Sequence, residues 1–98
     1  MAEYLEKIVF GTLRELGEET NNKALINADK DTSIYGPGRN MDSLTLVRFI
    51  SEVEEAVYDE MNVEVVIANE KAMSMKHSPF RTVATFTDYL KQLIEESQ

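Results

Sequence analysis

Apolar residues recur every three or four positions in three stretches of this chain of 98 residues. The stretches cover residues 3 to about 17, about 42–60 and about 82–96, and polar residues fill the positions between the apolar ones. This pattern is typical of amphipathic helices that bury one side against a shared core. The expected core positions are Leu5, Ile8, Val9, Leu13 and Leu16 in the first stretch, Leu46, Val47, Ile50, Val53, Val57 and Met61 in the second, and Val83, Phe86, Leu90, Leu93 and Ile94 in the third.

The segment between the first two expected helices, residues 18–41, loses this periodicity. It is rich in Asn and Asp, includes Ser33 and contains the run Gly36-Pro37-Gly38, all residues that favour turns or interrupt helices. A loop of this length is unusual in so small a protein and is often functional. Five of its apolar residues are expected to anchor it to the helices: Ala24, Leu25, Ile26, Ile34 and Tyr35.

The stretch after the second helix has the weakest pattern. Residues 63–67 have some strand character, but no second stretch of similar character exists to pair with them, so we expect no sheet. Residues 69–75 fit a short helix, and Pro79 ends whatever precedes it, because the residue before a proline disfavours the helical conformation. Thr82 or Thr85 is expected to cap the last helix.

These elements predict an all-α fold. The expected architecture is a small four-helix bundle, three helices long and one short, with a long loop between helices one and two. The length suits one domain over residues 1–98 and leaves no room for a second core.

Composition narrows the function classes. Cysteine is absent, so disulfides, zinc–thiolate sites and a cysteine nucleophile are excluded. Eighteen acidic residues against ten basic ones give a formal net charge of −8, which disfavours binding to nucleic acid and favours partners with basic patches. No basic stretch followed by an apolar run marks a leader, and no apolar segment is long enough to cross a bilayer. We therefore expect a cytoplasmic monomer that does not insert into membranes.

An enzyme is not expected. The chain has one histidine, His77, in a polar stretch, and Ser43 does not lie in a Gly-x-Ser-x-Gly elbow, so no nucleophile–base pair can be assigned. A calcium-binding loop is a separate possibility, since Asn27, Asp29, Asp31 and Ser33 have the alternating spacing of its early oxygen ligands. Neither possible register supplies the required glycine and glutamate, so solvated turn residues explain the run better.

The most informative position is Ser43, in the sequence Asp42-Ser43-Leu44. Asp42 is a strong N-cap candidate, which places Ser43 in the first turn of the second helix. An anionic group attached there faces unpaired backbone N–H groups and the positive end of the helix dipole, so the position suits a phosphodiester. Capping alone also explains a Ser or Asp at a helix start, and the tripeptide occurs by chance in many proteins.

Further along the same helix, acidic residues cluster at Glu52, Glu54, Glu55, Asp59 and Glu60. An ordinary solvated face is the simplest interpretation, although a partner acting at Ser43 would have to touch this helix. The simplest interpretation of the methionines at positions 41, 61, 73 and 75 is that they are flexible core residues. A minority alternative is that Met73 and Met75 line a cavity for an apolar chain.

Taken together, these features resemble the acyl carrier proteins, and the similarity extends over almost the whole chain. Its sharpest parts are Met41-Asp42-Ser43-Leu44 with the following Val47 and Ile50, the acidic residues 52–55, Asn62-Val63-Glu64-Val65, and Thr82-Val83 leading to Asp88-Tyr89-Leu90.

The resemblance implies that Ser43 receives a 4'-phosphopantetheine arm from coenzyme A, with Asp42 and Leu44 beside it. In that family the thiol of the arm carries acyl groups as thioesters for fatty acid, lipid or polyketide synthesis, and the carrier itself does no chemistry. The implied partners are a phosphopantetheinyl transferase and acyl-transferring and condensing enzymes with basic docking patches. Arg48, Glu52, Glu55 and Asp59 are the expected contact residues.

Three departures from the family pattern point to a specialised carrier. Asn40 stands where a glycine is usual, Thr45 and Arg48 occupy positions that are usually acidic, and residues 65–82 form a longer connection than in typical carriers. The alternative is a carrier-like domain that lacks the prosthetic group and serves only as a protein interaction module.

Overall fold

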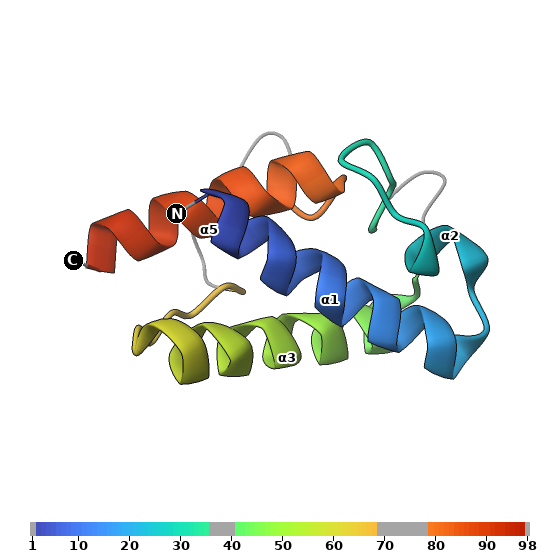
Figure 1. Cartoon of the computed structure of the whole chain (residues 1–98), viewed down its shortest axis with the longest axis horizontal. Coiled ribbons are helices and arrows are strands. Elements are labelled where there is room, and N and C mark those ends of the chain that lie inside the picture. The colour runs from blue at the N-terminus through green and yellow to red at the C-terminus, as the bar shows by residue number, and fades with distance from the viewer. Residues whose placement is uncertain (1, 36–40, 69–78, 98) are drawn as a thin grey trace.

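The computed structural model describes residues 2–35, 41–68 and 79–97, with the backbone but not the side chains of Ala2 and Ser43. These ranges contain four helices, α1 (Ala2–Thr20), α2 (Lys23–Ile26), α3 (Ser43–Met61) and α5 (Val83–Ser97), drawn in Figure 1. No strand occurs in them, only a single antiparallel bridge between Ser33 and Thr82. The predictions of an all-α bundle, of its three long helices and of no sheet at residues 63–67 are confirmed.

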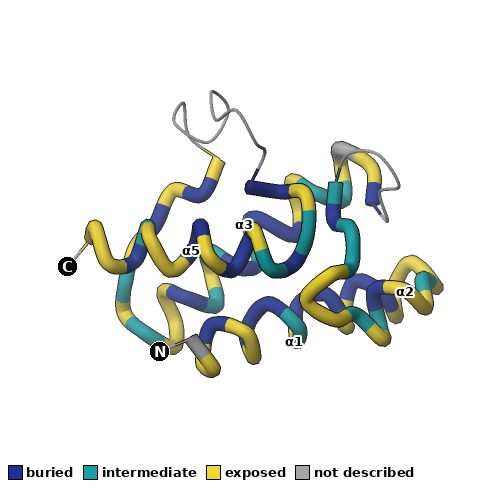
Figure 2. The backbone as a smooth tube through the Cα atoms, turned by 90° about the horizontal axis from the view of Figure 1, so that it is seen from above, coloured by how far each residue is buried: buried dark blue, intermediate teal, exposed yellow. Residues whose placement is uncertain are grey.

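Helix α1 contacts each of the other three helices (Figure 1). Its five expected core residues, from Leu5 to Leu16, are all buried, and Glu3, Glu6 and Lys7 are exposed, as the periodicity predicts. Figure 2 shows buried positions recurring along α1, α3 and α5, with exposed positions between them. Of the helices described, none combines the length and the apolar content needed to cross a bilayer.

The connection after α1 is more ordered than the expected loop. Helix α1 continues to Thr20, Asn21 adopts the left-handed conformation with φ 56°, and Asn22 caps α2 by accepting hydrogen bonds from the N–H groups of Ala24 (3.0 Å) and Leu25 (3.3 Å). Leu25 is buried, whereas Ala24 is exposed, so its expected role as an anchor was wrong. The predicted short helix at residues 69–75 lies outside the described residues.

The later part of this connection is fastened to the start of α5. The N–H groups of Ile34 and Tyr35 donate to the carbonyls of Arg81 (2.8 Å) and Phe80 (2.9 Å). Ile34 is fully buried and Tyr35 is half-buried, so both expected anchors are confirmed. These two backbone hydrogen bonds hold residues 34–35 against the segment that leads into α5.

Helix α5 begins with a reciprocal cap made by two threonines. The Thr82 hydroxyl accepts from the Thr85 N–H at 3.2 Å, and the Thr85 hydroxyl accepts from the Thr82 N–H at 3.0 Å. The ring of Phe86 then packs on Phe49 of α3 with centroids 4.9 Å apart, and this contact joins the two helices in the core.

The inward side of α3 differs from the prediction at two positions. Phe49 is fully buried, and Ile50, Val53 and Val57 are buried beside it, but Val47 is 61% exposed. The prediction that Val47 belongs to the core was wrong. Phe49 fills that role because it faces Phe86 of α5.

The segment after α3 is held by side chains from two helices. Asn62 ends α3 in the left-handed conformation, and Ile67 is fully buried. The Ile67 N–H donates to Glu54 Oε2 of α3 at 2.8 Å, and the Tyr89 hydroxyl of α5 donates to the Ile67 carbonyl at 2.9 Å. These two hydrogen bonds fix the chain as it leaves α3.

Candidate functional site

The start of α3 is built by three consecutive residues before and at its first turn. Met41 is buried, and Asp42 adopts an extended conformation and caps the helix, its Oδ1 accepting from the Thr45 N–H at 2.8 Å. The Asp42 carbonyl also accepts from the Leu46 N–H at 2.9 Å. The predicted N-cap is confirmed, and Ser43 is the first residue of α3.

The surroundings of Ser43 combine solvent exposure with a helix terminus. Asp42 before it is exposed, and Leu44 after it is 80% exposed. The first turn of α3 contains no acidic residue, and the capping carboxylate of Asp42 lies at the positive end of the helix dipole. An anionic group attached to residue 43 would therefore lie at the N-terminal, positive end of the α3 dipole.

An exposed apolar stripe, defined here as Leu44, Val47 and Tyr58, runs along the outer side of α3. The exposed fractions of these side chains are 80%, 61% and 54%. Positions 44 and 47 are three residues apart, and 44 and 58 are two heptads apart, so all three lie on one side of the helix. Sequence reasoning missed the stripe because it assigned Val47 to the core, although Phe49 offered an alternative inward residue.

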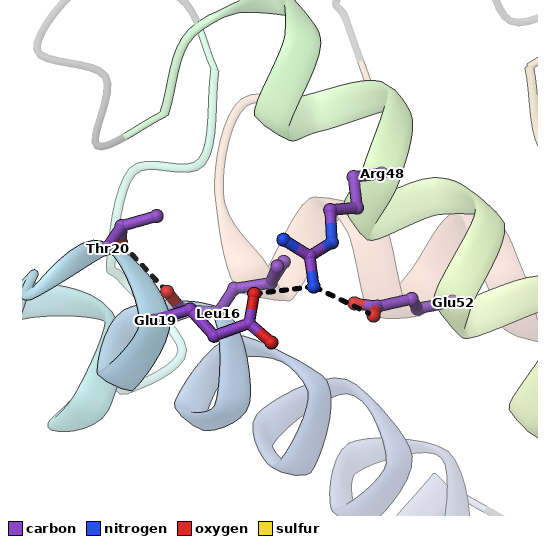
Figure 3. Close-up of polar contacts among 5 residues, drawn as sticks. All are labelled: Leu16, Glu19, Thr20, Arg48 and Glu52. Carbon is purple, nitrogen blue, oxygen red and sulfur yellow. Dashed lines mark hydrogen bonds and ion pairs between the residues drawn. The ribbon is translucent and has the colours of Figure 1, made fainter.

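Arg48 joins the start of α3 to the end of α1, as Figure 3 shows. Its Nη2 pairs with Glu19 Oε2 of α1 and lies 3.7 Å from Glu52 Oε1 one turn along α3. All three side chains are between one third and about one half exposed, so each pair contributes little stability alone and serves mainly to orient the helices. The two expected contact residues Arg48 and Glu52 thus face toward α1.

The other two expected contact residues, Glu55 and Asp59, line a groove between α1 and α3 together with Glu52. The groove has a volume of about 580 Å³. Its lining residues are Tyr4, Lys7, Ile8, Gly11, Thr12 and Glu15 of α1 and Glu52, Glu55, Ala56, Asp59 and Glu60 of α3. We refer to it as the α1/α3 groove.

Glu54 does not belong to this acidic face. It is half-buried, and its carboxylate accepts the Ile67 N–H inside the structure. The acidic cluster read from the sequence therefore divides into a structural residue, Glu54, and the residues that line the groove. A helical-wheel placement of Glu54 opposite Glu52 carries the only sequence signal for this division.

The calcium-like run is a turn in the structure. Asp29 Oδ1 accepts from the Asp31 N–H at 2.9 Å, so the side chain is used by the turn itself. Within the described ranges, no group of three or more His, Asp or Glu residues is arranged to hold a metal ion. His77, Met73 and Met75 lie outside those ranges, so the expectations about them stay predictions.

No protein-family model, curated protein or solved structure matches the chain.

Proposed function

We propose that the protein is an acyl carrier, with Ser43 as the attachment point of a 4'-phosphopantetheine arm. The observation that carries the proposal is the position of Ser43 as the first residue of a capped helix, between two exposed neighbours, Asp42 and Leu44. The arm, when attached, supplies a thiol that holds acyl groups as thioesters for fatty acid, lipid or polyketide-type synthesis.

The residues around Ser43 have separate roles in this proposal. Asp42 fixes the first turn of α3 through its hydrogen bond to Thr45, so the backbone of the attachment residue is held at the start of a regular helix. Met41, buried just before it, anchors the end of the preceding connection. A carrier needs this rigidity because several enzymes must find the arm at the same place on its surface.

Partner enzymes would recognise the serine end of α3 through the exposed apolar stripe. Leu44 and Val47 lie within one turn of Ser43, and such exposed aliphatic side chains gain free energy when a partner covers them. Further along the same helix, the acids Glu55 and Asp59 favour partners with basic patches, through attraction that also accelerates encounter. A phosphopantetheinyl transferase is the first such partner, and the acyl-transferring and condensing enzymes follow.

The proposal is tested by intact-mass measurement after incubation with coenzyme A and a broad-specificity phosphopantetheinyl transferase. We expect a mass increase equal to one phosphopantetheine in the wild-type protein and none in Ser43→Ala. Ser51→Ala, an exposed serine on the same helix, is the matched control and should be modified like the wild type. A folded wild-type protein that gains no mass, beside an active control carrier, would overturn the proposal.

The alternative function, a protein interaction module without the prosthetic group, predicts a different result for Ser43→Ala. If the domain acts without the arm, Ser43→Ala should capture the same cellular partners as the wild type and support the same growth. If the carrier function is correct, Ser43→Ala should abolish the dependent synthesis even though the domain remains folded by circular dichroism.

A further inference from the structure

A second groove lies between α1 and the region of α2. It has a volume of about 330 Å³, and we refer to it as the α1/α2 groove. Its lining residues are Lys7, Phe10, Gly11 and Arg14 of α1, Leu25 and Ile26 of α2, and Ala28 just after α2. Phe10, Ile26 and Ala28 are half-buried, so each keeps part of its apolar surface accessible in the groove. A Cβ atom added at Gly11 would meet nothing within 4 Å, so the groove is open beside this residue.

The charged residues of this groove are basic. Lys7 and Arg14 are both exposed, and no acidic residue in the described part of the chain lines the groove with them. Lys7 forms no ion pair with another described residue. Arg14 pairs with Glu18 at 3.4 Å, but the two side chains are 69% and 62% exposed, so the pair contributes little stability and Glu18 can be exchanged for a carboxylate of a partner. On a chain of net charge −8, the groove is a local site for anionic groups.

The two cations stand at opposite ends of an apolar stretch. Lys7 and Arg14 are seven residues apart on α1, so they lie on nearly the same side of the helix, about 10.5 Å apart along its axis. Phe10 and Gly11 lie between them. Along α1 the groove therefore presents a cation, an apolar surface and a second cation.

From this arrangement we infer that the α1/α2 groove is a docking site for an amphipathic helix of a partner protein, with Asp or Glu at positions i and i+7 and apolar residues at i+3 and i+4. The two carboxylates of that helix would meet Lys7 and Arg14, and its apolar residues would cover Phe10, Ile26 and Ala28. A helix is the fitting form because its residues i and i+7 lie on one side at the required spacing of about 10.5 Å. In an extended strand, residues about 10 Å apart are three positions apart and point to opposite faces.

This site is independent of the proposed carrier function. None of its described lining residues belongs to α3, the helix that carries Ser43 and the acids Glu55 and Asp59. The net charge of −8 repels an acidic helix at long range. At an ionic strength of 0.15 M the Debye length is about 8 Å, so the charges inside the groove decide binding there.

The test measures binding of a fluorescein-labelled helical peptide to the full chain, by fluorescence anisotropy at an ionic strength of about 0.15 M. The peptide has glutamates at i and i+7 and leucines at i+3 and i+4 in an alanine-rich background. A second peptide of the same composition has its glutamates at i+2 and i+9, on the opposite side of the helix, and should bind at least about tenfold more weakly. Equal binding of the two peptides would overturn the proposed arrangement.

Charge-reversed variants locate the site on the protein. Lys7→Glu/Arg14→Glu should weaken binding of the first peptide about tenfold or more. Arg81→Glu/Lys91→Glu, at exposed positions outside the groove, is the matched control, since both double variants change the formal net charge from −8 to −12. The control should weaken binding by less than about threefold, because it alters only the long-range repulsion. Equal losses in the two double variants would overturn the assignment of the groove.

A variant without a charge change separates shape from electrostatics. Gly11→Leu fills the open part of the groove and should weaken binding about tenfold, whereas Ser43→Ala should bind like the wild type. Circular dichroism establishes that each variant is folded, and Lys7→Gln/Arg14→Gln replaces the charge reversal if the latter unfolds α1. Unchanged binding by Gly11→Leu, weaker binding by Ser43→Ala, or failure of the wild type to bind the first peptide would overturn the proposal.

Discussion

Gly11 and Gly17 lie in the same helix, α1, and the structure gives them opposite constraints. Gly11 is exposed, and a Cβ there meets nothing within 4 Å. Gly17 is buried, and a Cβ there would lie 2.8 Å from the backbone nitrogen of Ile26 and 2.9 Å from the carbonyl oxygen of Asn22. The second glycine therefore allows the α2 region to approach α1.

We predict opposite signs for the two alanine substitutions. Gly11→Ala should raise the free energy of unfolding by about 0.5–1 kcal/mol, because alanine loses less backbone entropy in a helix. Gly17→Ala should lower it by about 1–3 kcal/mol, because the backbone of the next segment must move. Urea denaturation of both variants checks this, and a common sign for the two changes would contradict the assignment of Gly17 as a contact residue.

At the residue scale, roles that depend on neighbouring residues could be predicted from the sequence, whereas roles that depend on contacts with distant residues could not. The cap formed by Asp42 depends only on the next three residues, so it could be predicted. The role of Gly17 depends on where Ile26 is brought by the turn at Asn21 and Asn22, which periodicity does not report. Glu54 was assigned to a solvated face for the same reason, since its partner Ile67 is thirteen residues away.

At the scale of elements, the long amphipathic helices were predictable because each repeats its apolar pattern over several turns. Helix α2 was missed because a four-residue helix is too short for periodicity to appear. On the inward side of α3, Val47 was included and Phe49 was omitted, because apolar residues surround its first two turns at Leu44, Leu46, Val47, Phe49 and Ile50. In the structure Phe49 lies inward, four residues before the buried Val53, and its ring packs against Phe86 of α5.

Two hydrogen bonds attach the segment after α3 to helices α3 and α5, and their contribution to stability can be tested. Tyr89→Phe removes the hydroxyl that donates to the buried Ile67 carbonyl and should lower the free energy of unfolding by about 1–2 kcal/mol. Glu54→Ala removes the acceptor of the Ile67 N–H and should act similarly, whereas Glu54→Gln keeps an acceptor oxygen and should cost less.

Urea denaturation gives the free energies, and amide hydrogen exchange gives a local readout at Ile67. Faster exchange of that amide is expected in Glu54→Ala and in Tyr89→Phe. Unchanged exchange in both variants would show that these two hydrogen bonds do not hold the segment.

At the scale of the whole molecule, net charge acts on stability. With a formal charge of −8 and a radius of gyration of 12.4 Å, most charges lie within reach of one another at low salt, where the Debye length is about 30 Å at 0.01 M. At 0.15 M the Debye length is about 8 Å, and repulsion across the molecule is screened.

We therefore expect the melting temperature to rise between 0.01 M and 0.15 M sodium chloride, by about 4–8 °C for each kcal/mol of repulsion removed. Glu55→Lys/Asp59→Lys should reduce the rise because its formal charge is only −4. Differential scanning calorimetry measures the effect. A melting temperature that falls with salt would show that the ion pairs around Arg48 outweigh the overall repulsion.

The overall bundle could be predicted because three apolar faces on a short chain must share one core. The α1/α3 groove could not, because it depends on the angle at which the two helices cross and on which acids that angle brings together. Glu15 and Glu55 are forty residues apart in sequence, and nothing local to either residue reports that they line the same groove.

The central place of α1 among the helices has a consequence for synthesis on the ribosome. Its apolar side is covered in part by α2 and α3 and is completed by α5, so part of it stays uncovered until residues 83–97 have been translated. At a translation rate of about 5–20 residues per second, the roughly sixty residues between the two helices take about 3–12 s. For those seconds the apolar side of α1 that faces α5 has no partner from within the chain, and the core cannot be completed before α5 emerges.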